Sequence, residues 1–326
     1  MSQSPFTPFV LDESRRQAWL RAALQIRPSG ASHDELLAPA ARLAREYLPK
    51  ELFAALTDVT RPHGPSVCLI DNLPIDPALP SPPTDGRRPN QKTTWVSELV
   101  LLGATRALGL ELVTFLQEKR GAWPQEVAPV TGLEKTNSSA SREEFGAHAD
   151  NAILPTWVRL WISLIGLVNE NQTETYFAPL DDILSALEPR IVDRLWEPIY
   201  RVTFPESFEM GREYFKTQPI LFRGPAGETE IKFTAYSVVG TTPEGEAAVT
   251  ALRNVLPGLL RPAVLKPGTL CLFSNSRALH ARGRIEGARW AQRIYLGQPQ
   301  TLVNLQTVTG AGPSNRVFDA RLLATP

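Results

Sequence analysis

The chain has 326 residues, 43% of them hydrophobic, and its 34 basic residues balance its 34 acidic residues at a formal net charge of zero. This length and apolar content allow a sizeable buried core, and the even charge excludes the electrostatic signature of a protein that binds nucleic acid or an anionic membrane. No apolar run is long enough to span a bilayer, and the first residues lack the pattern of a signal peptide, so we expect a cytoplasmic protein that acts on a small molecule.

The N-terminal part of the chain predicts helices, and the rest is dominated by short strands. Residues 12–58 have apolar positions at helical spacing in two segments, and residues 92–118 show this spacing again despite Gly103 and Gly109. Alternating or short apolar runs predict strands at 67–70, 157–167, 200–204, 219–222, 230–236, 269–273 and 293–297. Helices are expected between them at 180–195 and 244–256.

This order of elements predicts an α+β fold with a mainly β core, in which a double-stranded β-helix (jelly roll) carries N-terminal and inserted helices. We expect one domain over residues 1–326, with helical support in 1–65, the jelly-roll core in about 66–300 and a C-terminal extension in 301–326. Cys68 and Cys271 lie in strand-like runs and are expected to be buried thiols, which fits a reducing cytoplasm.

The segment Phe145-Gly146-Ala147-His148-Ala149-Asp150 is the most informative part of the sequence. Residues two apart in a strand point to the same side, so His148 and Asp150 would face one cavity. His280 can join them, because a rolled-up sheet brings distant strands together. Two imidazoles and a carboxylate on one face of the metal are typical of non-heme Fe(II) oxygenases. We therefore predict His148, Asp150 and His280 as the metal ligands and catalytic residues.

The alternative is that these histidines are structural. A His-x-Asp tripeptide often arises by chance, and a single histidine is more often hydrogen-bonded or exposed than bound to a metal. However, the chain has only four histidines, and His33 and His63 lie in polar or Pro/Gly-rich segments typical of a surface. Both remaining histidines fall within the pattern, which favours the metal site.

A second group of polar residues follows His280. If residues 289–295 form a strand, Arg289, Arg293 and Tyr295 share the face that points into the same cavity. Guanidinium groups bind carboxylates through paired hydrogen bonds, so two arginines near a metal suit two carboxylate-bearing ligands. The alternative is a solvated cluster, since Arg282 and Arg284 are close in sequence.

The ordered combination of these motifs resembles the clavaminate synthase-like, taurine dioxygenase-related group of Fe(II)/2-oxoglutarate dioxygenases, of the amino-acid hydroxylase type. The resemblance spans roughly residues 66–297 and rests on the run 127–134, the segment Thr136-Asn137-Ser138-Ser139, the His148-Ala149-Asp150 motif and the series His280, Arg289, Arg293 and Tyr295. It implies that Fe(II), 2-oxoglutarate and dioxygen serve to hydroxylate an unactivated carbon of a free L-amino acid or derivative.

The resemblance also implies a role for each matching residue. It makes His148, Asp150 and His280 the iron ligands and assigns Arg289 and Thr175 to 2-oxoglutarate, with Arg289 on the far carboxylate. It assigns to the amino-acid substrate Arg293 (its carboxylate), Gln117 (its amine), Ser138 and Tyr295. The short segment between His280 and Arg289 leaves open which arginine, Arg289 or Arg293, takes which carboxylate.

Two departures from the family pattern bear on the reaction. Asp150 stands where many members have glutamate, but a carboxylate is retained, which favours hydroxylation over the halogenation of relatives that have a small residue there. Thr234 and Tyr236 stand where arginine and lysine hydroxylases resemble an Asp-x-Asp arrangement. A buried cation without a counter-charge is costly, so we expect a substrate with a non-cationic side chain bound near Thr234 and Tyr236.

Several alternatives stay open at this point. The substrate could be an aminoacyl group tethered to a carrier protein, and the oxidation could end in desaturation or cyclisation. A metal-dependent hydrolase or isomerase on the same fold would need no 2-oxoglutarate, and a non-catalytic binding protein would use its histidines structurally. The resemblance favours a role in specialised, natural-product metabolism such as antibiotic biosynthesis.

Overall fold

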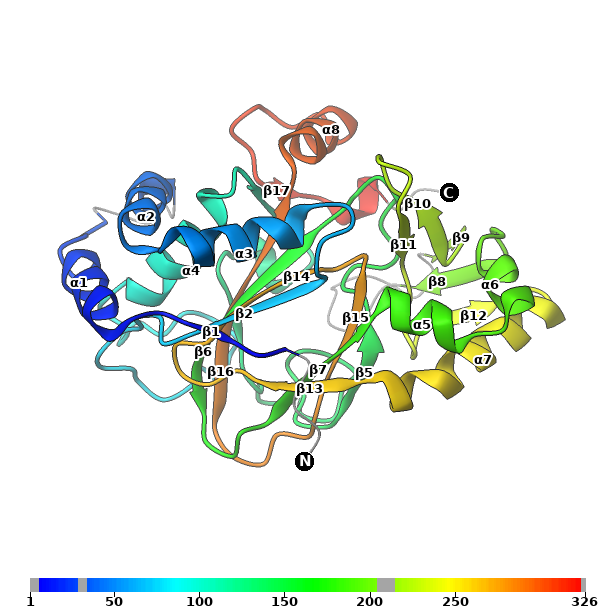
Figure 1. The fold of residues 1–326 in the computed structure, drawn as a ribbon, viewed down its shortest axis with the longest axis horizontal. Coiled ribbons are helices and arrows are strands. Elements are labelled where there is room, and N and C mark those ends of the chain that lie inside the picture. Colours follow the sequence, from blue (N-terminus) through cyan, green and yellow to red (C-terminus); the bar gives the residue numbers. More distant parts are fainter. Residues whose placement is uncertain (1–5, 29–33, 204–214, 324–326) are drawn as a thin grey trace.

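The computed structural model describes residues 6–28, 34–203 and 215–323, in which two facing β-sheets form the centre of the molecule (Figure 1). The larger sheet has eight strands, in the spatial order β1 (Phe9–Val10), β2 (Val67–Asp71), β14 (Leu270–Ser274), β6 (Trp161–Asn169), β16 (Arg289–Gly297), β3 (Glu111–Phe115) and β17 (Val317–Phe318), with β4 (Gln125–Val127) paired to β16. The smaller sheet has the order β13 (Arg261–Val264), β7 (Glu174–Pro179), β15 (Ala278–Arg282) and β5 (Phe145–His148).

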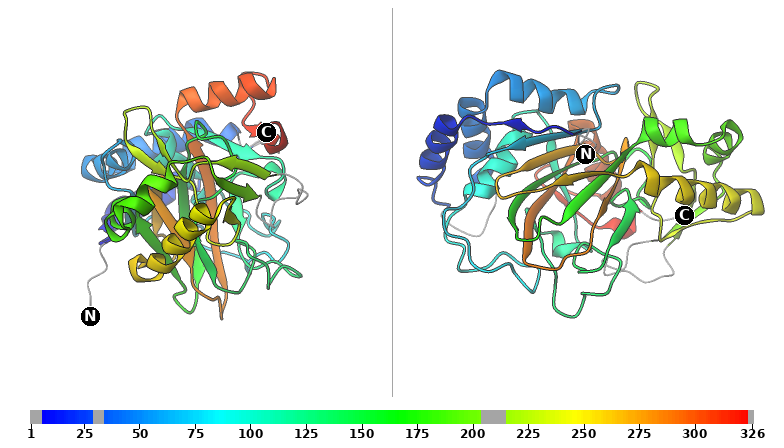
Figure 2. Two further views of the ribbon diagram at one scale, coloured as in Figure 1. Left: turned by 90° about the vertical axis from the view of Figure 1, so that its right-hand side faces the viewer. Right: turned by 60° about the horizontal axis from the view of Figure 1, so that its bottom comes forward.

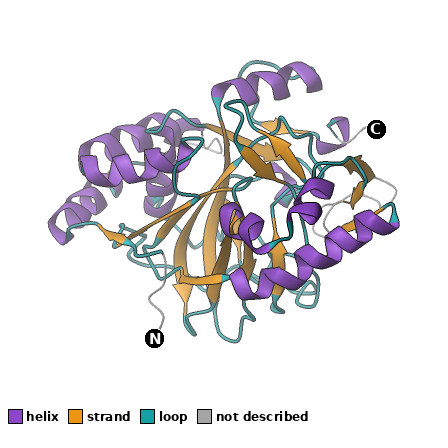
Figure 3. Ribbon diagram, turned by 45° about the vertical axis from the view of Figure 1, so that its right-hand side comes forward, coloured by secondary structure: helices purple, strands orange, loops and turns teal. Residues whose placement is uncertain are grey.

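Two short sheets lie outside this pair. One has the order β12 (Val238–Gly240), β8 (Tyr200–Thr203) and β9 (Phe215–Gln218), and the other pairs β10 (Leu221–Arg223) with β11 (Thr229–Ile231). The helices are α1 (Glu13–Ala23), α2 (Asp34–Tyr47), α3 (Lys50–Thr60), α4 (Val96–Arg106), α5 (Leu180–Ala186), α6 (Pro189–Leu195), α7 (Pro243–Leu259) and α8 (Pro299–Thr309), with short 3-10 turns η1 (Lys119–Gly121) and η2 (Ala320–Leu322). Figure 3 shows the strands inside and the helices around them.

Side-chain alternation gives the larger sheet two different faces. In β6, Ile162 and Leu164 belong to the core between the two sheets, whereas Trp161 and Ile165 pack with helices α1–α4 on the opposite face. The helices α5–α7 lie at the other end of the molecule, as two further views show (Figure 2). The inner core therefore lies between the sheets, and it contains a cavity whose lining residues come from strands and loops rather than from helices.

The observed elements correct several predicted boundaries. The predicted helix 92–118 is wrong in its second half, because α4 ends at Arg106 and residues 111–115 form β3. Gly109 has a φ of +77°, which stops the helix, and β3 then pairs with β16. Residues 12–58 form three helices, with a break before Pro49, and 180–195 forms two. Helix α8 (Pro299–Thr309) was not predicted, because residues 301–326 were expected only as a C-terminal extension.

The remaining expectations are mostly met at the level of elements. Strands occur within or beside each predicted run, although the run 230–236 is a strand only up to Ile231. Cys68 and Cys271 are buried free thiols, as predicted. His63 is exposed, and His33 lies outside the described residues. Among the described residues, no helix has both the length and the apolar character needed to cross a membrane.

Candidate active site

The three predicted metal ligands converge at one edge of the smaller sheet. His148 at the end of β5 lies directly opposite His280 in β15, and their ring centroids are 4.1 Å apart. Oδ1 of Asp150 lies 3.3 Å from Nε2 of His148 and 3.8 Å from Nε2 of His280. One possible ligand atom from each residue lies within 4.8 Å of the other two, and the part of the chain that the structure describes contains no other such cluster.

The protonation and hydrogen bonding of these residues fit a divalent metal. Nδ1 of His148 lies 2.8 Å from the carbonyl oxygen of Gly146, so that nitrogen carries the proton, and the buried Nε2 has no hydrogen-bond partner. Burial, with His148 close by, lowers the pKa of His280 to about 3, so its ring is neutral. Burial alone would raise the pKa of Asp150, but Arg293 and the two histidines hold it well below its usual range. The neutral ring of His280, the unpartnered Nε2 of His148 and the ionised carboxylate of Asp150 thus form a donor set that suits a divalent metal.

Asp150 reaches the cluster in a different way from the predicted one. Strand β5 ends at His148, so Asp150 lies in the turn that follows rather than two positions further along a strand. The Asn275 side chain binds the Asp150 main chain at two points. Its Oδ1 accepts from the Asp150 N–H at 2.8 Å, and its Nδ2 donates to the Asp150 carbonyl at 2.8 Å. This contact joins the segment before His280 to the segment after His148.

Arg293 and Tyr295 lie on the inner face of β16, as predicted, and both contact Asp150. Nη1 of Arg293 donates to Oδ2 of Asp150 at 2.7 Å, and the hydroxyl of Tyr295 donates to the same oxygen at 2.9 Å. Nε of Arg293 donates to Oε1 of Gln125 on β4 at 3.0 Å. The oxygen that faces away from the histidines is therefore held in place by two donors.

Glu118 is the second carboxylate of this cluster, and sequence reasoning missed it. Its Oε1 accepts from Nη2 of Arg293, and it lies 3.0 Å from the Tyr295 hydroxyl, whose single proton is shared between this oxygen and Oδ2 of Asp150. Its Oε2 is buried and has no partner. Burial raises the pKa of Glu118, and Arg293 opposes that rise. One guanidinium thus lies between two carboxylates, with one carboxylate oxygen still free to accept a hydrogen bond.

The other predicted arginine lies at a separate position on the same inner face. Nη2 of Arg289 donates to Oγ1 of Thr175 on β7 at 3.2 Å, so these two residues, predicted to act together, are in contact. Both line a cavity that also includes His148, His280, Arg282 and Arg293. Burial lowers the pKa of Arg289 to about 10, which still leaves it cationic at neutral pH.

The predicted side-chain pocket has an aromatic wall. The Phe145 ring lies 4.0 Å from the His148 ring and 5.4 Å from the Tyr236 ring, measured between centroids. Thr234 forms a β-bridge with His148, and its hydroxyl is hydrogen-bonded to that of Ser237. Thr234 and Tyr236 therefore both lie beside His148, the first predicted metal ligand.

Two predicted substrate residues, Gln117 and Ser138, form hydrogen bonds with residues outside the cluster around Asp150. Nε2 of Gln117 donates to Oδ1 of Asp319 at 2.7 Å, and its Oε1 accepts from the Ala320 N–H at 2.9 Å. Gln117 thus contacts the C-terminal turn η2, and its neighbour Glu118 points into the cluster. The hydroxyl of Ser138 is 2.8 Å from that of Thr136, while Ser139 lines the cavity.

Comparison with known proteins agrees with this geometry. Residues 96–295 match the family model described as taurine catabolism dioxygenase TauD, TfdA family, which is more than half of the chain. The chain belongs to the TauD/TfdA family. The match includes both histidines, Asp150 and the two arginines of β16.

Individual relatives of this TauD/TfdA family member include amino-acid oxygenases. An L-asparagine oxygenase of Streptomyces coelicolor is 29% identical over 286 residues, which cover 84% of each chain. A structure of an asparagine oxygenase with Fe(II), 2S,3S-3-hydroxyasparagine and succinate has a TM-score of 0.82 at 22% identity, over 96% of this chain and 99% of that one. The non-heme iron oxygenase OrfP with Fe, succinate and (3S)-hydroxy-L-Arg has a TM-score of 0.82 at 20% identity, with the same coverage. Both structures share the mixed α/β fold of this chain.

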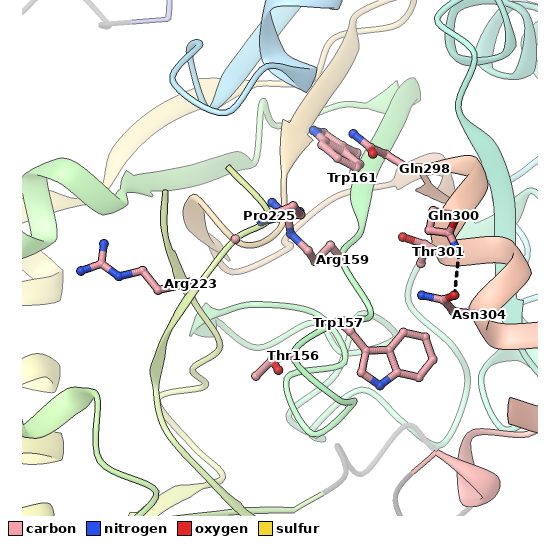
Figure 4. A pocket seen from close by; sticks show the side chains of 11 residues that line it. Thr156, Trp157, Arg159, Trp161, Arg223, Pro225, Gln298, Gln300, Thr301 and Asn304 are labelled. Carbon is pink, nitrogen blue, oxygen red and sulfur yellow. Dashed lines mark hydrogen bonds between the residues drawn. The ribbon is translucent and has the colours of Figure 1, made fainter. Parts of the chain in front are cut away.

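Larger hollows on the surface of this TauD/TfdA family member do not reach the metal ligands. One of about 330 Å³ lies between α8 and the segment around Trp157 and Arg159 (Figure 4). Arg159 there is already paired with Glu228 and Glu230. This hollow therefore presents no unpaired charge from Arg159, and the smaller cavity between the sheets is the place where the metal-binding chemistry lies.

Proposed function

We propose that this chain is an Fe(II)- and 2-oxoglutarate-dependent dioxygenase that hydroxylates a free L-amino acid with a non-cationic side chain. The observation that carries the proposal is the convergence of His148, Asp150 and His280 beside Arg293 in one cavity. His148, Asp150 and His280 would hold the iron. The bound iron and 2-oxoglutarate would supply the oxidation that inserts an oxygen atom from dioxygen into a C–H bond.

The cluster around Arg293 fits the head group of a free amino acid. Four of the five N–H groups of Arg293 donate to Gln125, Asp150 and Glu118, so its remaining N–H would bind the substrate carboxylate, and the unpartnered Oε2 of Glu118 would accept from the substrate ammonium. A cation and an anion side by side complement a zwitterion. An aminoacyl thioester on a carrier protein has no free carboxylate, so this arrangement favours the free amino acid. In this role Glu118 replaces Gln117 as the residue that meets the amine.

The wall of the pocket supports a non-cationic substrate side chain. Phe145 and Tyr236 present aromatic rings there, and Thr234 presents a hydroxyl in place of a carboxylate. A lysine or arginine side chain would lose its hydration beside these residues without gaining a counter-charge from them. We therefore propose that this enzyme is a hydroxylase of neutral amino acids. We also propose that Ser138 and Tyr295 lie at the edge of the substrate site.

Further parts of the proposal concern the whole chain. We propose that the two facing sheets are the halves of a double-stranded β-helix, that residues 1–326 form one domain, and that the enzyme works in the cytoplasm in natural-product metabolism. The large sheet and the opposed four-stranded sheet support the first of these points, and the two buried free thiols support a reducing compartment.

The test is aerobic incubation of the Fe(II)-loaded protein with 2-oxoglutarate and a panel of free L-amino acids, followed by mass spectrometry of product and succinate. We expect one neutral amino acid to gain one oxygen atom with stoichiometric succinate, and His148→Ala to abolish both products. Preferred turnover of arginine or lysine would contradict the pocket assignment. Turnover restricted to a carrier-bound aminoacyl thioester would contradict the role of Arg293.

A further inference from the structure

Arg282 is a buried arginine of the cavity to which neither the sequence pattern nor the comparisons assign a function. It lies two positions after His280 in β15, so the two side chains share the inner face of the smaller sheet. Arg282 is only 6% exposed and lines the same cavity as Arg289 and Thr175. Its position in the strand is directly opposite Thr175 of β7.

Arg282 and Arg289 form a pair of buried like charges. Among the described residues, no carboxylate forms an ion pair with either guanidinium. Each guanidinium keeps its positive charge, because an arginine side chain is not deprotonated in proteins, and both side chains line one cavity. Two desolvated cations close together are unfavourable unless an anion binds between them.

Other arginines with buried or partly buried side chains show how unusual this pair is. Arg293 contacts Asp150 and Glu118, and Arg159 contacts Glu228 and Glu230. Even Arg277, whose hydrogen bonds go to main-chain carbonyls, has Glu230 and Asp181 near enough to raise its pKa against the effect of burial.

The hydrogen bonds of Arg282 leave part of its guanidinium free. Nη1 donates to the Gly283 carbonyl at 2.8 Å and Nη2 donates to the Ser141 carbonyl at 2.9 Å. Two of the five N–H groups of Arg282 thus donate to neutral acceptors. These two hydrogen bonds fix the orientation of the planar guanidinium group. Arg289 uses one N–H on Thr175. Among the described residues, the other N–H groups of the two guanidinium groups have no acceptor, and both side chains line the cavity.

We propose that Arg282 is a second cosubstrate-binding residue, which acts with Arg289 and Thr175 on the far carboxylate of 2-oxoglutarate. This inference rests on the proposed function, because it takes 2-oxoglutarate as the cosubstrate. The cosubstrate is a dianion with a carboxylate at each end, and its oxo-acid end would face the metal held by His148, Asp150 and His280. A pair of cations at the opposite end of the cavity recognises the second negative charge.

The test compares two ligands that differ only at that end. 2-Oxovalerate has the same five-carbon chain as 2-oxoglutarate, with a methyl group in place of the far carboxylate. Anaerobic calorimetry on the Fe(II)-loaded protein gives a dissociation constant for each, and their ratio reports recognition of the far carboxylate. In Arg282→Gln we expect this ratio to fall by about tenfold or more, with affinity for 2-oxovalerate unchanged, since one charge-assisted contact is worth at least that factor.

Matched variants separate recognition from folding. Arg277→Gln removes a partly buried arginine that is also held by main-chain carbonyls, and it should lower the melting temperature without changing the ratio. Arg282→Lys keeps the stem and the charge but loses the fork, so its ratio should fall by about threefold or more even if the glutamine variant does not fold. A wild-type ratio in both Arg282 variants would show a purely structural residue and overturn the proposal. Failure of the wild type to bind 2-oxoglutarate would instead overturn the proposed function.

Discussion

Asn275 binds the main chain of Asp150 at two points, and no other described side chain links the two halves of the metal site so directly. Asn275→Ala should weaken iron binding by roughly tenfold or more, because the loss of a residue that orients a ligand commonly costs that factor. Equilibrium dialysis against Fe(II) under anaerobic conditions measures it. The exposed Asn90→Ala is the control, and equal iron affinity in both variants would contradict this role.

Single residues at the site could be predicted only where the pattern is simple. The ligands were found because histidines are few in this chain and the His-x-Asp spacing is short. Strand β3 ends at Phe115, and a turn follows in which Lys119 and Arg120 have positive φ. Strand alternation therefore cannot predict whether Gln117 or Glu118 points into the cluster. Asn275 and Arg282 lie within five positions of His280 in the sequence. Their roles could not be predicted, because each depends on a partner more than 100 positions away.

At the scale of elements, Gln117 joins the end of β3 to the C-terminal turn η2. Gln117→Ala should lower the free energy of unfolding by about 1–3 kcal/mol, because it leaves the buried Ala320 N–H without an acceptor and removes a hydrogen bond to Asp319. The KM for the amino acid should stay unchanged. Urea unfolding and steady-state kinetics together decide the matter. A raised KM at wild-type stability would return Gln117 to the substrate site.

The elements themselves were predicted better than their boundaries. Apolar alternation identified β6, β14 and β16 because their two faces pack against two different layers. Residues 111–115 continue the helical spacing of apolar residues that precedes them in the sequence. They form strand β3 because they pair with β16. Its pairing is decided by tertiary contacts, which local periodicity does not contain.

At the scale of the whole molecule, a buried polar network joins α4 to the outer face of the larger sheet. Glu126 accepts from Trp290 at 2.6 Å and from Gln292 at 3.0 Å, and Gln292 also donates to Glu98 at 3.1 Å. Lys92 is fully buried against Glu98 and Asp76. Burial, with Glu98 close by, raises the pKa of Glu126 from 4.5 to about 7.

This shift predicts a pH dependence of stability. The folded chain holds the Glu126 proton more tightly than the unfolded chain, so the contribution is complete below the unfolded pKa and is lost as pH rises through about 7. The loss is at most about 3 kcal/mol. Urea unfolding at several pH values should show wild type losing stability relative to Glu126→Gln between about pH 5 and pH 8. Parallel curves for the two proteins would refute the assignment.

The proposed dioxygenase activity requires one iron ion bound by His148, Asp150 and His280. An anaerobic titration with Fe(II) in the presence of 2-oxoglutarate tests this binding most directly. We predict one iron per chain, a visible charge-transfer band that saturates with 2-oxoglutarate, and loss of both in His280→Ala. His63→Ala, at an exposed histidine, should leave both intact. Iron binding that survives unchanged in His148→Ala and His280→Ala would show that these histidines do not bind the iron.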